Sequence, residues 1–401
     1  MAKKNKPAIR FKEFTDAWEQ RKLGEVSESY SGGTPSVGVK EYYGGQIPFI
    51  RSAEINSEIT ELFLTEEGLK KSSARLVAMG DILYALYGAT SGEVGRARLR
   101  GAINQAILAI NPHTGYDSEY LAQWLRKSKH SIIETYLQGG QGNLSGTIVK
   151  ELLVDFPSLK EQRAIGDFFS QLDHLITLHQ RKYDKLQVLK KAMLEKMFPK
   201  NGSSVPEIRF KGFTDAWEQR KLGDLLVERN QQAPMSNEYP LMAFIANEGV
   251  APKGERYDRS ALVTDTVNKL YKKTEKGDFI YSSNNLETGS IGLNKYGKAC
   301  ISPVYSIFEP TGIADSDFLG RRLVRKDFIN AMVKWRQGVI YGQWRIHESD
   351  FLKIEIPVPS VEEQRKIGAF LDQLDHLITL HQRELEKLQN IKKSMLEKMF
   401  A

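Results

Sequence analysis

The amino-acid sequence repeats itself, and this repeat constrains the fold more than any other feature. Residues 9–25 recur at 208–224 with two changes in seventeen positions, and residues 157–198 recur at 359–400 with 30 identities in 42 positions. The offsets between the copies are 199 and 202 residues. The chain therefore consists of two halves. The two repeated segments of each half form what we call the frame, which is nearly identical in both halves.

The residues between the repeated segments differ in the two halves. Residues 26–156 and 225–358 contain short strand-like runs separated by glycine-rich turns. A helix is expected near 117–137 in the first insert and near 315–336 in the second. We therefore expect an α+β domain in each half. A common frame that carries two divergent inserts indicates two related but different recognition tasks.

The second repeated segment has the pattern of a long helix. Ser158 and Glu161 have the spacing of a capping box, and no proline lies between Pro157 and Pro199. Residues at spacings of three and four form a heptad seam, which is mostly apolar but includes a histidine in each copy. The seam comprises Ile165, Phe169, Leu172, Ile176, His179 and Leu186 in the first copy, and Ile367, Leu371, Leu374, Ile378, His381 and Leu388 in the second.

A narrow apolar stripe needs a partner, and the obvious partner is the other copy. Each helix would be about 60 Å long, whereas a domain of this size is about 40 Å across and cannot easily return the chain along it. The pair is therefore expected to be antiparallel, with helices at 158–199 and 359–401 and globular domains at 1–157 and 200–358. The alternative is that each helix packs separately on its own domain.

The expected fold class is thus α+β. Two globular mixed α/β domains are separated by an antiparallel pair of long coiled-coil helices, in a pseudo-two-fold internal repeat.

The sequence lacks the motifs of enzymes that act on DNA. It contains no Pro-Pro pair for an adenine methyltransferase, and no lysine has an acid two residues before it, as a metal-dependent nuclease requires. A glycine and lysine spacing like a phosphate loop occurs at 292–298, but Ala299 replaces the Ser or Thr that would bind Mg²⁺. His174 and His179 are five residues apart, whereas the two histidines of a helical zinc site are four apart, so the pair does not have the spacing of such a site. We expect no catalytic centre, cofactor or metal on this chain.

The charge balance favours a polyanionic partner. The formal net charge is +7 and the sequence pI is about 9.1, and such an excess of Lys and Arg attracts phosphate backbones. The single cysteine, Cys300, suits a reducing cytoplasm. No apolar run approaches the ~20 residues that cross a bilayer, so no membrane association is expected.

Candidate DNA contacts are polar and basic residues in the loops of the two inserts. Arg, Lys, Asn and Gln read base edges, while Lys, Arg and small polar groups contact phosphates. The candidates in the first insert are Thr34, Tyr84, Tyr87, Thr90, Ser91, Arg96, Arg98, Gln141, Asn143 and Ser145. Those in the second are Ser283, Asn284, Asn285, Lys295, Lys298, Gln343, Trp344 and Arg345.

Two motifs of the frame carry a family resemblance. Phe-Thr-Asp-Ala-Trp-Glu-Gln-Arg-Lys-Leu-Gly opens each half at 14–24 and 213–223, and Pro-Ser-x-x-Glu-Gln-Arg ends each insert at 157–163 and 359–365. In this order and duplication, the chain resembles the specificity subunits of type I restriction–modification systems over residues 9–400.

This resemblance implies a division of labour among subunits. The two globular domains would be target recognition domains, each reading half of a bipartite, asymmetric sequence in double-stranded DNA. The helices would set the gap between half-sites and dock two modification subunits, which bind S-adenosylmethionine and methylate adenine. Restriction subunits, which hydrolyse ATP with Mg²⁺ and cut DNA, would join them. Two alternatives remain: an adaptor whose two domains bind proteins, and a self-contained DNA-modifying enzyme.

Overall fold

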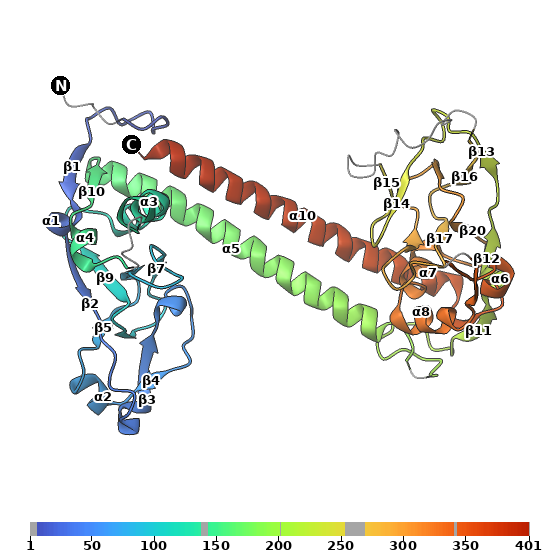
Figure 1. Ribbon diagram of the computed structural model, residues 1–401, viewed down its shortest axis with the longest axis horizontal. Helices are drawn as coiled ribbons and strands as arrows, with labels where there is room; N and C mark the ends of the chain where they lie inside the picture. The colour runs from blue at the N-terminus through green and yellow to red at the C-terminus, as the bar shows by residue number, and fades with distance from the viewer. Residues whose placement is uncertain (1–5, 138–142, 201, 253–268, 341–342, 401) are drawn as a thin grey trace. The chain divides into compact units, whose positions relative to one another are not determined.

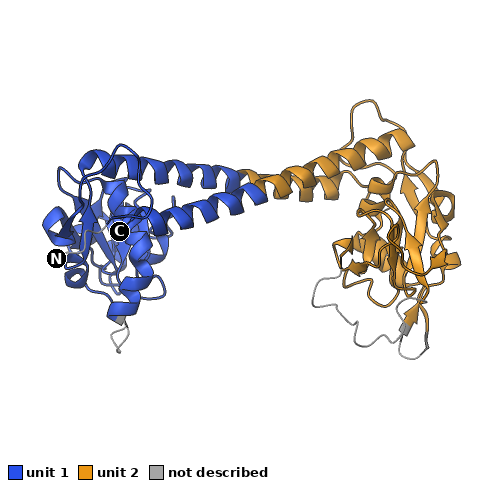
Figure 2. Cartoon of the chain, turned by 90° about the horizontal axis from the view of Figure 1, so that it is seen from above, with its two compact units in different colours: residues 1–181, 382–401 blue, residues 182–381 orange. Residues whose placement is uncertain are grey.

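The computed structural model describes residues 6–137, 143–200, 202–252, 269–340 and 343–400. The chain forms two compact units, which Figure 2 shows in different colours. Unit 1 comprises residues 1–181 and 382–401, and unit 2 comprises residues 182–381. Within the described part of the chain, no helix is long and apolar enough to span a membrane.

Two long helices contribute to both units. Helix α5 spans Leu159–Lys196 and helix α10 spans Val361–Met399 (Figure 1). The hydroxyl oxygens of Ser158 and Ser360 accept from the N–H groups of Glu161 and Glu363, both at 3.4 Å, as N-caps do. The expected capping box is not formed, because the Glu161 carboxylate binds Arg10 instead.

In unit 1 the two helices run antiparallel. Lys392 near the end of α10 binds Asp173 of α5 at 2.5 Å, and Phe400 stacks on Phe169 with ring centroids 5.8 Å apart. Phe400 also lies 5.2 Å from the ring of Tyr120, inside the core of the first insert. The alternative of two helices packed separately is therefore wrong.

Unit 2 repeats this arrangement with equivalent residues. Lys190 binds Asp375 at 2.5 Å, and Phe198 lies 5.5 Å from the ring of Phe318. The positions predicted for the heptad seam are all buried or half-buried in the structure. They are Ile165, Phe169, Leu172, Ile176, His179, Leu186, Ile367, Leu371, Leu374, Ile378, His381 and Leu388.

The repeated frame also closes each insert. Strand β1 (Glu19–Lys22) pairs antiparallel with β10 (Leu153–Phe156), and β11 (Glu218–Lys221) pairs in the same way with β23 (Glu355–Val358). Each insert therefore begins and ends on one two-stranded ribbon, which leads directly into a long helix.

The insert of unit 1 contains two four-stranded sheets and the helix expected at 117–137. The sheet orders are β2-β9-β6-β7 and β4-β3-β8-β5, and the helix is α3 (Ser118–Leu137). The strands are β2 (Ser27–Ser31), β3 (Tyr43–Ile50), β4 (Phe63–Leu64), β5 (Arg75–Val77), β6 (Ile82–Ala85), β7 (Val94–Arg96), β8 (Gly101–Ile103) and β9 (Ile107–Pro112). The short helices are α1 (Leu23–Val26), α2 (Glu66–Lys70) and α4 (Gly146–Lys150).

The insert of unit 2 keeps the first sheet and changes the second. Its four-stranded sheet has the matching order β12-β20-β17-β18, but beside it lie a three-stranded sheet, β13-β16-β19, and the hairpins β14-β15 and β21-β22. The strands are β12 (Leu226–Glu228), β13 (Gln232–Ala233), β14 (Ala243–Ile245), β15 (Gly249–Ala251), β16 (Tyr271–Thr274), β17 (Phe279–Tyr281), β18 (Ile291–Leu293), β19 (Ala299–Ile301), β20 (Ser306–Pro310), β21 (Gln337–Ile340) and β22 (Gln343–Arg345).

The single helix expected near 315–336 is instead two helices, α7 (Ser316–Arg322) and α8 (Lys326–Val333). Arg325 between them has an extended backbone, with φ −73° and ψ 146°. Its guanidinium donates to the Leu194 carbonyl of α5 and lies 5.2 Å from the Phe198 ring. This contact with the end of the long helix fixes the break. The remaining short helices of this half are α6 (Leu222–Leu225) and α9 (Glu348–Phe351).

Candidate nucleic-acid interface

Two candidates of the first insert are part of its core. Tyr84 is 0% exposed on β6, and within the described chain its hydroxyl has no hydrogen-bond partner. This burial raises the pKa of the phenol. Ser91 is also buried, and its hydroxyl donates to the Gly88 carbonyl. The prediction that Tyr84 and Ser91 face DNA is wrong, because the four-stranded sheet buries Tyr84 and a tight turn closes over Ser91.

Arg96 holds the insert together instead of facing outward. It is half-buried, donates to Ser118 and pairs with Glu119 at 3.5 Å. Burial lowers the pKa of its guanidinium, although the Glu119 charge opposes this shift. Both partners lie at the start of α3, so Arg96 anchors that helix against β7.

The other first-insert candidates lie at or near the surface. Thr34 donates to the side chain of Gln105, and the Ser145 hydroxyl caps α4 by accepting from the Ile148 N–H at 3.2 Å. Tyr87 and Asn143 form a β-bridge, which brings their two loops together. Thr90 is half-buried and Arg98 is exposed. Gln141 lies outside the described residues.

Four candidates of the second insert line one cavity of about 450 Å³, which we name the recognition pocket. Ser283 and Asn284 come from the loop after β17, and Trp344 and Arg345 come from β22. The Ile346 N–H donates to the Ser283 hydroxyl oxygen at 3.0 Å, which joins the two loops. The pocket is lined by Lys272, Ser283, Asn284, Pro303, Val304, Tyr305, Ser306, Gly338, Trp344, Arg345, Ile346 and Glu348.

The rim of the recognition pocket carries groups that suit nucleic acid. Trp344 is 46% exposed, which is unusual for so large an apolar side chain, and the Arg345 side chain is mostly exposed. Arg336, which sequence reasoning missed, donates to the Ser283 carbonyl at 3.2 Å and pairs with Glu287 at 2.8 Å. Arg336 therefore fixes the position of the Ser283 loop. In the sequence Arg336 lies between Trp335 and Gln337, outside any motif that singles it out.

Three other candidates of this insert do not line the pocket. Lys295 pairs with Asp372 of α10 at 2.5 Å, and Lys298 pairs with Glu238 at 2.5 Å. The Glu238 carboxylate raises the pKa of Lys298. Both lysines thus have protein carboxylates as partners in the structure. Asn285 is exposed on the turn beside the pocket. The side chain of Gln343 lies outside the described residues.

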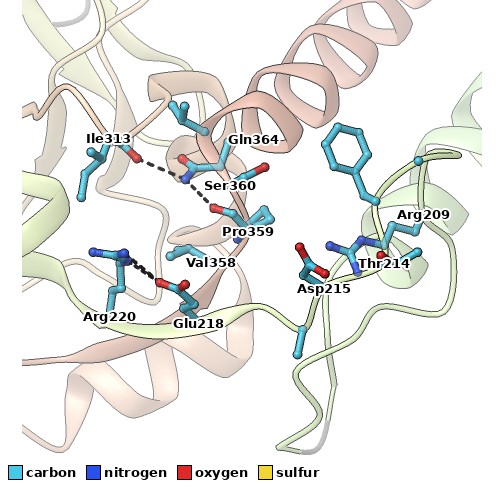
Figure 3. A pocket seen from close by; sticks show the side chains of 14 residues that line it. Arg209, Thr214, Asp215, Glu218, Arg220, Ile313, Val358, Pro359, Ser360 and Gln364 are labelled. Carbon is cyan, nitrogen blue, oxygen red and sulfur yellow. Dashed lines mark hydrogen bonds and ion pairs between the residues drawn. The ribbon is translucent and has the colours of Figure 1, made fainter.

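The repeated frame forms a second kind of surface in unit 2. A cavity of about 370 Å³ lies where the segment 212–220 meets the start of α10 (Figure 3). Arg209 pairs with Glu363 at 2.7 Å, and the Gln364 side chain donates to the Pro359 and Ile313 carbonyls. We name this cavity the frame pocket.

The equivalent residues of unit 1 make the equivalent contacts. Arg10 pairs with Glu161 at 2.6 Å, and Gln162 donates to the Pro157 carbonyl at 2.8 Å. The Gln162 side chain also accepts from the Asp117 N–H, as Gln364 does from the Asp315 N–H in unit 2. The motif Glu-Gln-Arg therefore has a structural role in both halves: Glu binds the opening segment and Gln binds the insert.

The comparisons with known proteins follow the same two-fold pattern. Residues 15–188 and 214–390 each match the family described as Type I restriction modification DNA specificity domain. The chain is 25% identical over 408 residues to the type I restriction enzyme MjaIX specificity subunit of Methanocaldococcus jannaschii, covering 95% of this chain and 92% of that protein. It is 25% identical over 177 residues to the EcoR124I/EcoR124II specificity subunit of Escherichia coli, covering 42% and 43% of the two chains.

A solved structure has the same fold over nearly the whole length. The crystal structure of a type I restriction–modification S subunit from M. genitalium superposes with a TM-score of 0.63 at 17% identity, covering 99% of each chain. The duplicated frame, the two α+β inserts and the family match over both halves agree. The chain therefore belongs to the family of type I restriction–modification specificity subunits, with two copies of the DNA specificity domain.

Proposed function

We propose that this chain reads a bipartite, asymmetric DNA target, with one insert for each half-site. The observation that carries the proposal is a common scaffold with different surfaces. Both inserts contain a four-stranded sheet of matching order, whereas their second sheets and loops differ. Because sequence is read by side chains at base edges, two different surfaces on one scaffold suit two different half-sites.

The chain in this proposal directs chemistry without performing it. S-adenosylmethionine would bind to the modification subunits, which methylate adenine, and ATP and Mg²⁺ would bind to the restriction subunits. The relatives named above are subunits of restriction enzymes, which supports this division. The candidate side chains of the recognition pocket offer amide, hydroxyl, guanidinium and indole groups, which bind nucleic acid.

Two modification subunits are proposed as partners, because the surface of the long helices is itself duplicated. Residues 171–181 recur without change at 373–383, although several of these side chains are exposed and do not belong to the seam. In unit 1, Leu175 and Leu178 are 40% and 38% exposed. In unit 2, Leu380 is 45% exposed. An exposed leucine that recurs in both halves, Leu178 and Leu380, suits two copies of one protein partner.

Mapping of methylated adenines tests the proposed function directly. This chain is expressed with a matching modification subunit in a host without other methylation, and modified adenines are located across the genome. We expect one two-part motif with a fixed gap. Exchange of residues 26–156 for the insert of another family member should change one half-site only. Absence of modified adenine, with a modification subunit shown to be active beside another specificity chain, would favour the protein-binding adaptor.

The stoichiometry of the complex tests whether the exposed leucines of the long helices bind the modification subunits. Leu175→Glu with Leu178→Glu should leave folding intact, because neither side chain is in the seam, and should reduce bound modification subunits from two to one. Val188→Glu is the matched control, since Val188 is exposed on the same helix but Asn390 occupies its place in the second copy. Native mass spectrometry measures the ratio. Two bound subunits in the double variant would contradict the assignment.

A further inference from the structure

Lys272 is a largely buried lysine whose charge acts on Glu348 without an ion pair between the two side chains. It lies in the middle strand, β16, of the three-stranded sheet, paired in register with Gln232 on one side and Ile301 on the other. The residue is 7% exposed, yet it makes no side-chain hydrogen bond or ion pair with any residue that the structure describes. Buried lysines are rare unless they are paired, because removing a charge from water is costly.

The side chain of Lys272 lines the recognition pocket. Its neighbour Lys273 lies on the opposite face of the strand, 4.3 Å from the ring of Tyr239. Lys272 therefore shares its face with Thr274, and the floor of the pocket is formed on that side of the sheet. A rigid central strand holds this cation in place whether or not a ligand is bound.

The charges around the pocket do not balance. Glu348 is the carboxylate that lines it, and it accepts a hydrogen bond from Ser306 at 2.7 Å and lies 3.9 Å from Arg345. Burial raises the pKa of Glu348, but the Ser306 hydrogen bond and the charges of Lys272 and Arg345 outweigh it, so the pKa is lowered. The carboxylate is thus ionised at neutral pH. Two cations and one anion leave a net positive pocket.

We propose that the recognition pocket binds one backbone phosphate of the DNA, with Lys272 as its buried counter-ion and Arg345 at the rim. A phosphate brings the negative charge that the pocket lacks, and Ser283 and Asn284 supply small polar donors at the mouth. In the free protein, one of the two positive charges of the pocket has no carboxylate in the lining to balance it, and the DNA phosphate would neutralise that charge. This inference rests on the proposed DNA-reading function and assigns the phosphate to the half-site read by residues 225–358.

This arrangement predicts opposite effects of Lys272→Met on stability and on binding. Methionine fills the space of the lysine stem and removes the buried charge, so the melting temperature of the chain without DNA should stay the same or rise. The affinity of the complex with modification subunits for its target should fall about tenfold or more, the value of a charged hydrogen bond. The slope of log affinity against log salt should become shallower by about one phosphate.

The controls separate this proposal from its rivals. Lys276→Met removes an exposed lysine two residues after β16 and should change neither property, while Lys272→Arg should retain much of the affinity. Loss of affinity confined to the cognate sequence, with an unchanged salt slope, would mean a base contact and overturn the phosphate assignment. Unchanged affinity, or a fall in melting temperature without a change in affinity, would overturn it too. Failure of the unsubstituted complex to bind any specific sequence would refute the proposed function instead.

Discussion

Asp375 joins three parts of unit 2, so its removal should weaken that unit more than an ordinary surface substitution. It accepts from Lys190 of α5 at 2.5 Å and from Arg321 of α7 at 2.5 Å, and it lies on α10 itself. The side chains of Lys190 and Arg321 are 28% and 14% exposed, so the cluster is only partly solvated.

Asp375→Asn keeps the shape of the side chain and removes its charge. Exposed ion pairs contribute at most about 1 kcal/mol, whereas breaking a buried pair costs about 3–5 kcal/mol. Because Asp375 makes two half-buried ion pairs, we expect the variant to lose about 2 kcal/mol of unfolding free energy. Since a domain of about 200 residues loses about 2–4 °C per kcal/mol, the melting temperature should fall by about 4–8 °C.

Differential scanning calorimetry of the full chain measures this change. Glu362→Gln is the control, because Glu362 pairs with Lys366 on the same helix at 3.2 Å but both side chains are mostly exposed. That variant should shift the melting temperature by less than 2 °C. Equal shifts for the two variants would refute the view that Asp375 binds the three helices together.

Three further predictions concern the pH dependence of stability, a glycine in a long helix and the length of the long helices. Burial raises the pKa of Asp372 and of Asp375, but hydrogen bonds and charges of Lys295, Lys190 and Arg321 lower both pKa values overall. The stability that these two carboxylates supply is therefore present above about pH 4 and is lost as the pH falls through their folded pKa values. Denaturant titrations between pH 5 and 2 should show a smaller loss of unfolding free energy in Asp375→Asn than in the unsubstituted chain. Gly166→Val should destabilise unit 1 by about 2 kcal/mol in urea titrations, because even a Cβ there would lie 2.7 Å from the Asp117 carboxylate oxygen, whereas Ala164→Val on the same helix should cost under 1 kcal/mol. Insertion of seven residues after both Arg181 and Arg383 should lengthen the gap of the methylated motif by about three base pairs, since seven helical residues add about 10 Å; an unchanged gap would exclude the helices as its determinant.

The parts of the fold that the sequence predicts are those in which one local pattern decides the structure. The seam from Ile165 to Leu186 follows from heptad spacing, and the frame follows from the repeat. The break at Arg325 was missed, because it depends on a carbonyl of Leu194, which lies far away in the sequence. Helical periodicity continues through the break and gives no sign of that distant contact.

The candidate site was harder to predict, because exposure depends on tertiary partners. Tyr84 looks like a loop-facing aromatic, but it is buried in a sheet. Lys295 and Lys298 have carboxylate partners 77 and 60 residues away, which a local pattern cannot reveal. Lys272 was overlooked for the opposite reason. Its neighbours Tyr271 and Lys273 suggest an ordinary half-exposed strand, in which a lysine would face water.

The packing of Phe400 has a consequence for how the protein is made. Met399 and Phe400 are 3% exposed in the core of unit 1, beside Tyr120 and Phe169, which the ribosome adds far earlier. At about 5–20 residues per second, translation from Phe169 to Phe400 takes roughly 10–50 s. Throughout that time the nascent first unit lacks Met399 and Phe400, and the apolar side chains that they cover, such as Tyr120 and Phe169, stay uncovered. Synthesis, not the folding of its own insert, therefore sets the moment at which unit 1 is complete.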